Sequence, residues 1–158
     1  MARPLRAFFA VMLAFGLFGC DHATKAIATQ TLARAVSIEP GILELHYVRN
    51  DDVAFNAFQR LGVPHPPLFL SAVMLVALAT AIGFTVVGQR RSPSRLDLIG
   101  GACIIGGALG NVADRIARGF VVDFIHVRGW PVFNVADIAV IVGVGLLALS
   151  RMKKRRVA

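Results

Sequence analysis

The stretch "GGALGNVADRIARGFVVDFI", residues 106–125, joins two different sequence patterns. Its first half is apolar and rich in glycine, and it ends in amide and charged side chains. Small residues at the spacing of Gly106 and Gly110 are typical of closely packed membrane helices. The overlapping segment "FVVDFIHV", residues 120–127, is rich in β-branched and aromatic residues, which is typical of a strand. We therefore expect a membrane helix followed by a strand outside the membrane.

The composition of the whole chain agrees with a membrane protein. Hydrophobic residues make up 56% of the 158 residues and charged residues only 16%; the mean hydropathy is +0.69. Apolar segments of roughly 20 residues are long enough to cross a bilayer. The fold class that we predict is a membrane α-helical protein, a single domain over residues 1–158, with four transmembrane helices at about 7–28, 66–88, 96–117 and 132–150.

Basic residues indicate which side of the membrane each loop occupies. Arg3 and Arg6 precede the first apolar segment, three arginines lie between the second and third, and "RMKKRR" (151–156) follows the fourth. Short loops rich in Lys and Arg stay in the cytoplasm, which explains the net charge of +8 without nucleic acid. We expect both termini in the cytoplasm and the segments at about 29–65 and 118–131 outside.

The two outward-facing segments contain candidate strands. "ILELHYV" (42–48) alternates in polarity, and "FVVDFIHV" (120–127) has high β-propensity. A small outward-facing β-sheet is therefore expected, with edges available to pair with an extended peptide.

Polar side chains on three of the expected helices fall at one depth. Counting about 1.5 Å per residue from the basic clusters places them just inside the outer boundary of the membrane. A charged group at that depth costs several kcal/mol unless it is paired or faces water. Ordinary explanations exist for single residues: snorkelling for Lys25, a helix-end pair of Asp114 with Arg118, and capping by Asn134. They do not explain the convergence of Asp21, Lys25, Asn111, Asp114, Arg115, Asn134 and Asp137.

Two carboxylates flank the segment that leaves the membrane and re-enters it. Asp123 lies in the expected outer strand and Asp137 at the start of the last helix, so the two can face each other. Close carboxylates share one proton, so one can activate water while the other donates to a carbonyl oxygen. This aspartic-protease arrangement needs no metal or cofactor. His22, His46, His65 and His126 show no metal-ligand spacing, and we assign no metal site.

Three motifs resemble those of the lipoprotein signal peptidase (signal peptidase II) family. They are "DHATK" (21–25), the stretch 106–125, and "FNVAD" (133–137), in this order. The resemblance implies an aspartyl endopeptidase, multi-pass in the bacterial inner membrane, with its active site facing the periplasm. It would cleave diacylglyceryl-modified prolipoproteins just before the lipidated cysteine. Its partners would be these prolipoproteins and membrane lipid, with no nucleic acid, and we expect a monomer.

The resemblance also assigns roles to individual residues. It implies that Asp123 and Asp137 are the catalytic pair. The residues it implies for substrate binding or support of the site are Asp21, Lys25, Asn50, Asn111, Asp114, Arg115 and Asn134.

One motif departs from the family pattern, which has Asn-x-Gly-x-Ala-Phe in the first outer loop. The chain has "NDDVAF" (50–55), so Asp52 stands where glycine is expected. Glycine there could serve a positive φ angle or a close backbone approach. A catalytically impaired or specialised member of the family therefore remains an alternative. A small proton-coupled membrane transporter is another, since acidic residues within a membrane often mark proton paths.

The first apolar segment has a further interpretation. "LFGC", residues 17–20, resembles the cleavage motif of a lipoprotein, which would make Cys20 a lipidated N-terminus. Phe18 is bulky for such a motif, and the apolar pattern resumes after Lys25. We expect a retained helix, with Cys20 and Cys103 as free thiols at different depths.

Overall fold

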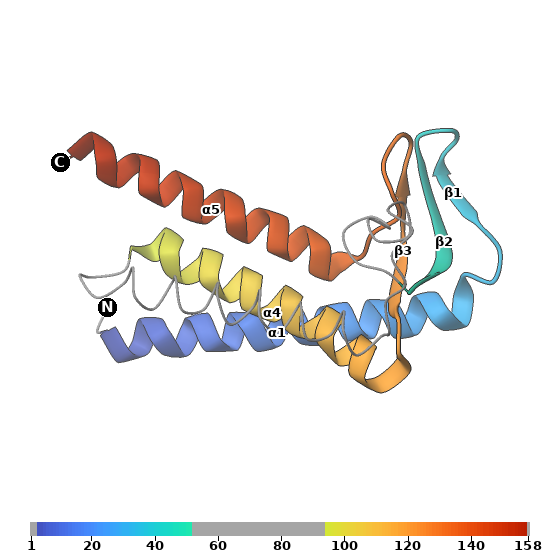
Figure 1. The fold of residues 1–158 in the computed structure, drawn as a ribbon, viewed down its shortest axis with the longest axis horizontal. Coiled ribbons are helices and arrows are strands. Elements are labelled where there is room, and N and C mark those ends of the chain that lie inside the picture. Colours follow the sequence, from blue (N-terminus) through green and yellow to red (C-terminus); the bar gives the residue numbers. More distant parts are fainter. Residues whose placement is uncertain (1–2, 52–93, 158) are drawn as a thin grey trace.

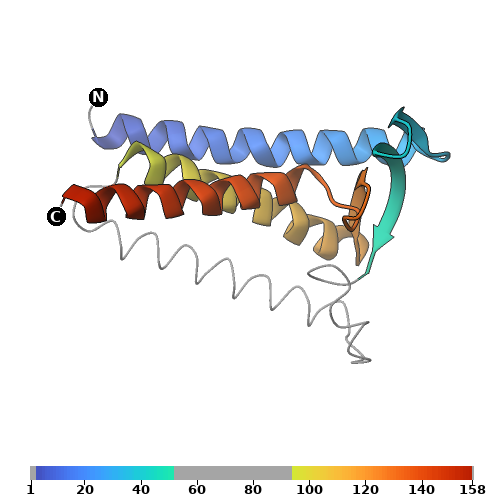
Figure 2. The same cartoon turned by 90° about the horizontal axis from the view of Figure 1, so that it is seen from above.

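The computed structural model describes residues 3–51 and 94–157. Three long helices lie alongside one another and a small sheet closes one end (Figure 1, Figure 2). The helices are α1 (Arg3–Thr31), α4 (Arg95–Arg118) and α5 (Val135–Val157). The strands are β1 (Val36–Glu39), β2 (Leu43–Asn50) and β3 (Val121–Val127).

These helices confirm the predicted helical segments at about 7–28, 96–117 and 132–150. Each is long and apolar enough to cross a membrane, over Leu5–Thr31, Arg95–Arg118 and Val135–Lys153. The predicted helix at about 66–88, together with Asp52 and His65, lies outside the described residues.

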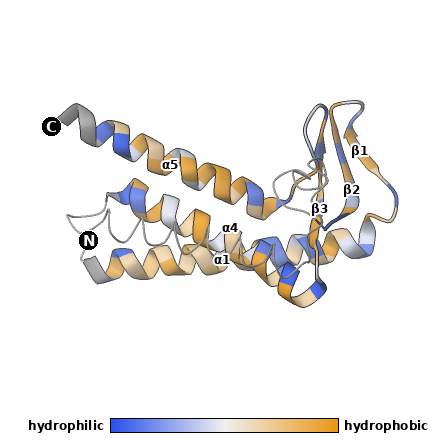
Figure 3. Cartoon of the chain, in the orientation of Figure 1, coloured by the Kyte–Doolittle hydropathy of each residue, from blue (hydrophilic) through white to orange (hydrophobic). Residues whose placement is uncertain are grey.

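The surface of the bundle is apolar, as expected for contact with lipid. Phe8 and Phe15 on α1 and Ile141 and Val144 on α5 are exposed, and hydrophobic residues predominate along both helices (Figure 3). α1 begins and α5 ends at the end of the bundle away from the sheet (Figure 1). The basic sequence segments at the start of α1 and at the end of α5 therefore lie at the same end of the bundle, opposite the sheet.

The N-terminal helix is continuous through the lipoprotein-like motif. α1 runs unbroken from Arg3 to Thr31, so Cys20 lies within it. Cys20 is exposed and Cys103 is buried, and no disulfide joins them. Retention of the segment before Cys20 stays a prediction.

The two ends of α4 are defined by local sequence. At its start, Ser94 Oγ accepts from the Asp97 N–H (3.2 Å) while Asp97 Oδ2 accepts from the Ser94 N–H (2.9 Å), a reciprocal capping box. At its end, Gly119 has φ +80° and its N–H donates to the Arg115 carbonyl. Glycine adopts this left-handed conformation without strain, so the chain can turn directly from α4 into β3.

The sheet is antiparallel, in the order β1-β2-β3. β2 and β3 confirm the predicted strands, whereas β1 was not predicted. In the β2–β3 pair, Leu45 lies opposite Ile125 but Val48 lies opposite Asp123, so β2 has one extra residue between them. Such a bulge changes the face to which later side chains point.

Glycines allow α4 and α5 to approach closely. A Cβ atom on Gly143 would lie 2.6 Å from the Gly100 carbonyl oxygen and 2.7 Å from Ile104 Cγ1. A Cβ atom on Gly106 would lie 2.6 Å from the Ala14 carbonyl oxygen of α1. The predicted small-residue spacing is thus used for helix packing, which brings the polar ends of three helices together.

Gly143→Ala is expected to separate α4 from α5 and to destabilise the protein by about 1–3 kcal/mol. Gly145→Ala is the matched control, because no described atom lies within 4 Å of a Cβ at Gly145. Unfolding of both variants in detergent, followed by circular dichroism, measures the difference. Equal stability of the two variants would contradict this account of the helix crossing.

Candidate active site

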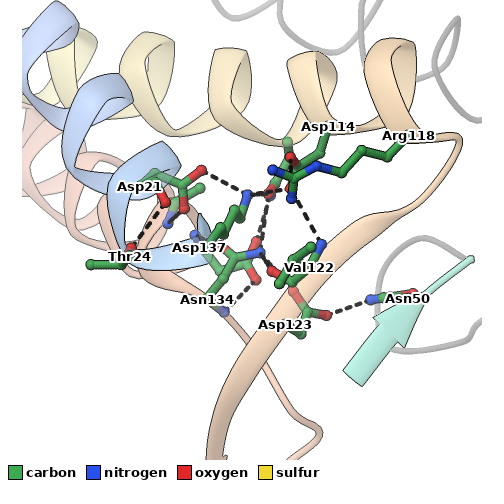
Figure 4. Close-up of polar contacts among 12 residues, drawn as sticks. Asp21, Thr24, Asn50, Asp114, Arg118, Val122, Asp123, Asn134 and Asp137 are labelled. Carbon is green, nitrogen blue, oxygen red and sulfur yellow. Dashed lines mark hydrogen bonds and ion pairs between the residues drawn. The ribbon is translucent and has the colours of Figure 1, made fainter. Parts of the chain in front are cut away.

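The polar residues of the three helices meet where the helices reach the sheet (Figure 4). Lys25 on α1 is at the centre of this cluster and is fully buried. Its Nζ lies 2.7 Å from Asp21 Oδ2 and 3.1 Å from Asp114 Oδ2, and it donates to Asn111 Oδ1 at 2.9 Å. The alternative that Lys25 snorkels to the interface is therefore wrong. One ammonium group instead links α1 to α4.

Asp114 connects this centre to the chain that leaves the membrane. Its Oδ1 lies 3.3 Å from Arg118 Nη1, which confirms the predicted helix-end pair. Its Oδ2 accepts from the Val122 N–H at 3.2 Å. Asp114 thereby fixes the start of β3 against the end of α4. Arg115, the neighbouring residue, is also buried.

The start of α5 is held by three side chains. Asn134 Oδ1 accepts from the Asp137 N–H (3.0 Å) and Asp137 Oδ2 accepts from the Asn134 N–H (3.2 Å). Asp21, from α1, accepts from the Ala136 N–H at 3.0 Å. The first N–H groups of a helix have no partner within it, so these contacts stabilise the helix start. They also fix the position of Asp137, and the predicted capping by Asn134 is confirmed.

Asp123 is held by two amide groups from different elements. It is buried in β3, and its Oδ2 accepts from Asn50 Nδ2 of β2 at 2.7 Å. Its Oδ1 lies 2.6 Å from Asn134 Nδ2. Burial raises the pKa of Asp123 to about 6, the negative charge of Asp137 adds to this shift, and the hydrogen bonds from Asn50 and Asn134 oppose it.

Two asparagines connect the two aspartates. Asn111 Nδ2 donates to Asp137 Oδ1 at 2.8 Å, and Asn111 Oδ1 lies 3.1 Å from Asn134 Nδ2. Asn134 in turn reaches Asp123. The structure therefore brings Asp123 and Asp137 into one hydrogen-bonded network, together with Asp21, Lys25, Asn50, Asn111, Asp114 and Asn134.

An apolar pocket of about 300 Å³ adjoins Asp137. Its lining residues are Val127, Trp130, Phe133, Ile138, Ile141 and Val142. Sequence reasoning did not identify this pocket. The signal that could have found it is the apolar spacing of Ile138, Ile141 and Val142 on one face of the helix, with Ile141 one turn after Asp137.

Such an arrangement can perform hydrolysis by acid–base chemistry. Asp123 is buried and holds its proton up to about pH 6, and Asp137 is partly exposed beside an apolar pocket.

A family model described as "Signal peptidase (SPase) II" matches residues 13–153. The chain belongs to the signal peptidase II family. The resemblance drawn from the three motifs is therefore confirmed.

Relatives of this signal peptidase II chain extend over nearly its whole length. A lipoprotein signal peptidase of Geobacter metallireducens is 37% identical over 98% of this chain and 96% of its own. One of Actinobacillus succinogenes is 39% identical over 86% of this chain and 85% of its own.

Two solved structures share the fold of this signal peptidase II chain. One is a bacterial membrane enzyme determined by the in meso method at 2.3 Å, with a TM-score of 0.76 and 23% identity over 93% of this chain and 89% of the other. The second, determined at 1.9 Å, has a TM-score of 0.73 and 24% identity over 92% and 93% of the two chains. The fold is thus that of a membrane enzyme.

Proposed function

We propose that this member of the signal peptidase II family cleaves prolipoproteins just before a diacylglyceryl-modified cysteine, with Asp123 and Asp137 as its catalytic pair. The observation that carries the proposal is the link between the two carboxylates. They come from a strand and a helix start, and Asn134 contacts both of them.

The two aspartates have different environments and therefore different roles. Asp123 is almost fully buried and its pKa is raised to about 6, so it holds the shared proton and donates to the scissile carbonyl oxygen. Asp137 is partly exposed and accepts a proton from the attacking water. The water oxygen bonds to the carbonyl carbon. The C–N bond then breaks as the leaving nitrogen receives the proton from Asp137, and the former carbonyl oxygen returns its proton to Asp123.

The apolar pocket beside Asp137 suits the lipid part of the substrate. Trp130, Phe133 and Ile141 line it, and acyl chains are transferred favourably from water to such a surface. Its position places an attached cysteine next to Asp137. A substrate that fills this pocket also excludes water, which further favours the protonated form of Asp123.

The buried polar residues support the catalytic pair without contacting substrate. Lys25 and Asp21 are buried and contact each other. Lys25 also contacts Asp114 and Asn111, and Asp21 accepts from the start of α5. They hold the acids in place. Asn50 reaches Asp123 directly, so it adjusts the proton affinity of that carboxyl.

The proposed placement in the cell has four membrane helices and both termini in the cytoplasm. The chain lies in the inner membrane as a monomer, and its sheet and catalytic pair face the periplasm. Supporting observations are the basic residues that the sequence has at the start of α1 and the end of α5, which lie at the end of the bundle away from the sheet (Figure 1), and the polar cluster beside the sheet (Figure 4). A proton path is disfavoured, because the charged groups of the described helices lie near the two ends of the bundle and the helix segments between them carry none.

The pH dependence of kcat/KM should report the proton on Asp123. We expect kcat/KM to fall as the pH rises through about 6, because the free enzyme then loses that proton. Asn50→Ala removes a hydrogen bond that favours the charged form, so it raises the pKa of Asp123 and moves the decline to higher pH. Glu39→Gln, an exposed residue of β1, is the control and should leave the profile unchanged. If kcat/KM of Asn50→Ala declined at the same pH as that of the natural enzyme, or at a lower pH, the assignment of this proton to Asp123 would be wrong.

Complementation tests the function in cells. The chain is expressed in a bacterium depleted of its own lipoprotein signal peptidase, and restored growth and lipoprotein processing are expected. An Asp52→Gly variant is tested in parallel. Processing by the variant but not by the natural chain would identify a catalytically impaired member of the family.

A further inference from the structure

A second cluster of side chains lies on the face of the sheet opposite the catalytic pair. Glu44 pairs with His126 across β2 and β3, whereas Asn50 pairs with Val121. Side chains alternate between the two faces of a strand, so His126 and Asp123 in β3 point to opposite faces. The bulge in β2 therefore puts Glu44 on the face of His126 and Asn50 on the face of Asp123.

His46 joins Glu44 and His126 at this bulge. The His46 and His126 rings are 5.4 Å apart, measured between centroids, and nearly perpendicular. His126 Nδ1 lies 3.8 Å from Glu44 Oε2. One ligand atom of each of the three residues lies within 4.8 Å of the other two. Pairing of β2 with β3 thus brings together three side chains that metals use as ligands.

His46 has a nitrogen that the surrounding chain does not satisfy. Its Nδ1 is buried and has no hydrogen-bond partner within residues 3–51 and 94–157. A buried polar atom of this kind carries a free-energy cost. The contact between His126 and Glu44 does not remove this cost, because it gives His46 Nδ1 no hydrogen bond from the described residues.

Two imidazoles and one carboxylate match the ligand preference of zinc. Zinc–ligand distances of about 2.0–2.1 Å in a tetrahedron place two ligands about 3.3 Å apart, so separations of up to 4.8 Å require small side-chain movements. The His126 and Glu44 side chains are more than one-third exposed, which allows these movements. Three protein ligands leave the fourth position for water.

We propose that Glu44, His46 and His126 form a binding site for a divalent transition metal of the zinc type. The bound ion links β2 to β3 at the bulge. The same two strands carry Asn50 and Asp123, so the ion steadies the contact between these residues from the other face of the sheet. The site is separate from the catalytic pair, and its occupancy does not enter the hydrolytic step.

Isothermal titration with ZnCl2 tests the site directly. The full chain is purified without a histidine tag, stripped with a chelator, and titrated in detergent. We expect one zinc ion per chain, and the visible absorption of a four-coordinate complex when Co2+ is used instead. His46→Ala and His126→Ala should abolish this binding, and Glu44→Gln should weaken it by about tenfold or more.

His22→Ala is the matched control, because His22 lies on α1 and stacks on Phe18. Circular dichroism identifies any variant that fails to fold, and Glu44→Gln then carries the test, since it keeps the shape of the side chain. Absence of binding by the natural chain would overturn the proposal. Binding that His22→Ala abolishes, or that survives both His46→Ala and His126→Ala, would also overturn it.

Discussion

Asp123→Asn and Asp137→Asn should each reduce cleavage of a diacylglyceryl-modified prolipoprotein by about 10²- to 10⁴-fold or more. An amide can neither accept a proton from water nor share one with the remaining carboxylate. Both variants keep the size of the side chain, and the Asn50 and Asn134 amides can still find an oxygen acceptor at position 123. The measurement is the initial rate of product formation by purified variants in detergent.

Asp51→Asn is the control for these two variants. Asp51 neighbours Asn50 in the chain, but it is exposed and pairs with Arg49 Nε at 2.8 Å, so its loss should leave the rate near that of the natural enzyme. If either catalytic variant folded and kept more than about one-tenth of the rate, the two-aspartate mechanism would be wrong.

Lys25→Met should destabilise the protein by about 3–5 kcal/mol. The substitution retains an unbranched side chain but removes the ammonium group that contacts both Asp21 and Asp114. The two carboxylates are 1% exposed, so they would stay buried without this cation. Unfolding in detergent measures the loss, and the rate of processing should fall with the fraction of folded protein.

Two comparisons separate this effect from a general sensitivity to charge. Asp51→Asn breaks an ion pair whose side chains are 58% and 60% exposed, and it should cost less than about 1 kcal/mol. Adding Asp21→Asn to Lys25→Met removes one stranded carboxylate and should restore part of the stability. A cost for Lys25→Met no larger than that for Asp51→Asn would contradict the central position of Lys25.

The polar cluster could be anticipated from the sequence because helices have a fixed rise. Counting residues from Arg6, Arg95 and Arg151 places Asp21, Asn111 and Asp137 at similar depths. In the structure Lys25 links Asp21 to Asn111, and Asn111 donates to Asp137. Counting gives height along a helix axis but not direction around it. It therefore left open whether Lys25 faced lipid or the other helices.

The contacts within the cluster could not be predicted, because they depend on how separate elements pack. The Asp21 contact with the start of α5 requires α1 and α5 to be adjacent there. The Asn111–Asn134 contact depends on the close crossing of α4 and α5. Glycine spacing indicated a close crossing but did not identify the partner of each glycine.

In the sheet, too, the features that depend on pairing between separate elements could not be predicted from the sequence. Alternating polarity predicted β2, and β-branched and aromatic residues predicted β3, but β1 is four exposed residues long and was not predicted. The bulge in β2 shifts the alternation at His46, and no turn or proline marks it in the sequence. As a result, the proximity of Glu44, His46 and His126 was missed, since only strand pairing brings them together.

The most direct test of the proposed function is mass spectrometry of the products formed by the purified enzyme. A diacylglyceryl-modified prolipoprotein and the same polypeptide without lipid are incubated with the natural chain and with Asp137→Asn. We predict a single cut, just before the lipidated cysteine, made by the natural chain only and only in the modified substrate. Absence of cleavage by the natural chain, cleavage at another bond, or equal cleavage by Asp137→Asn would contradict the account.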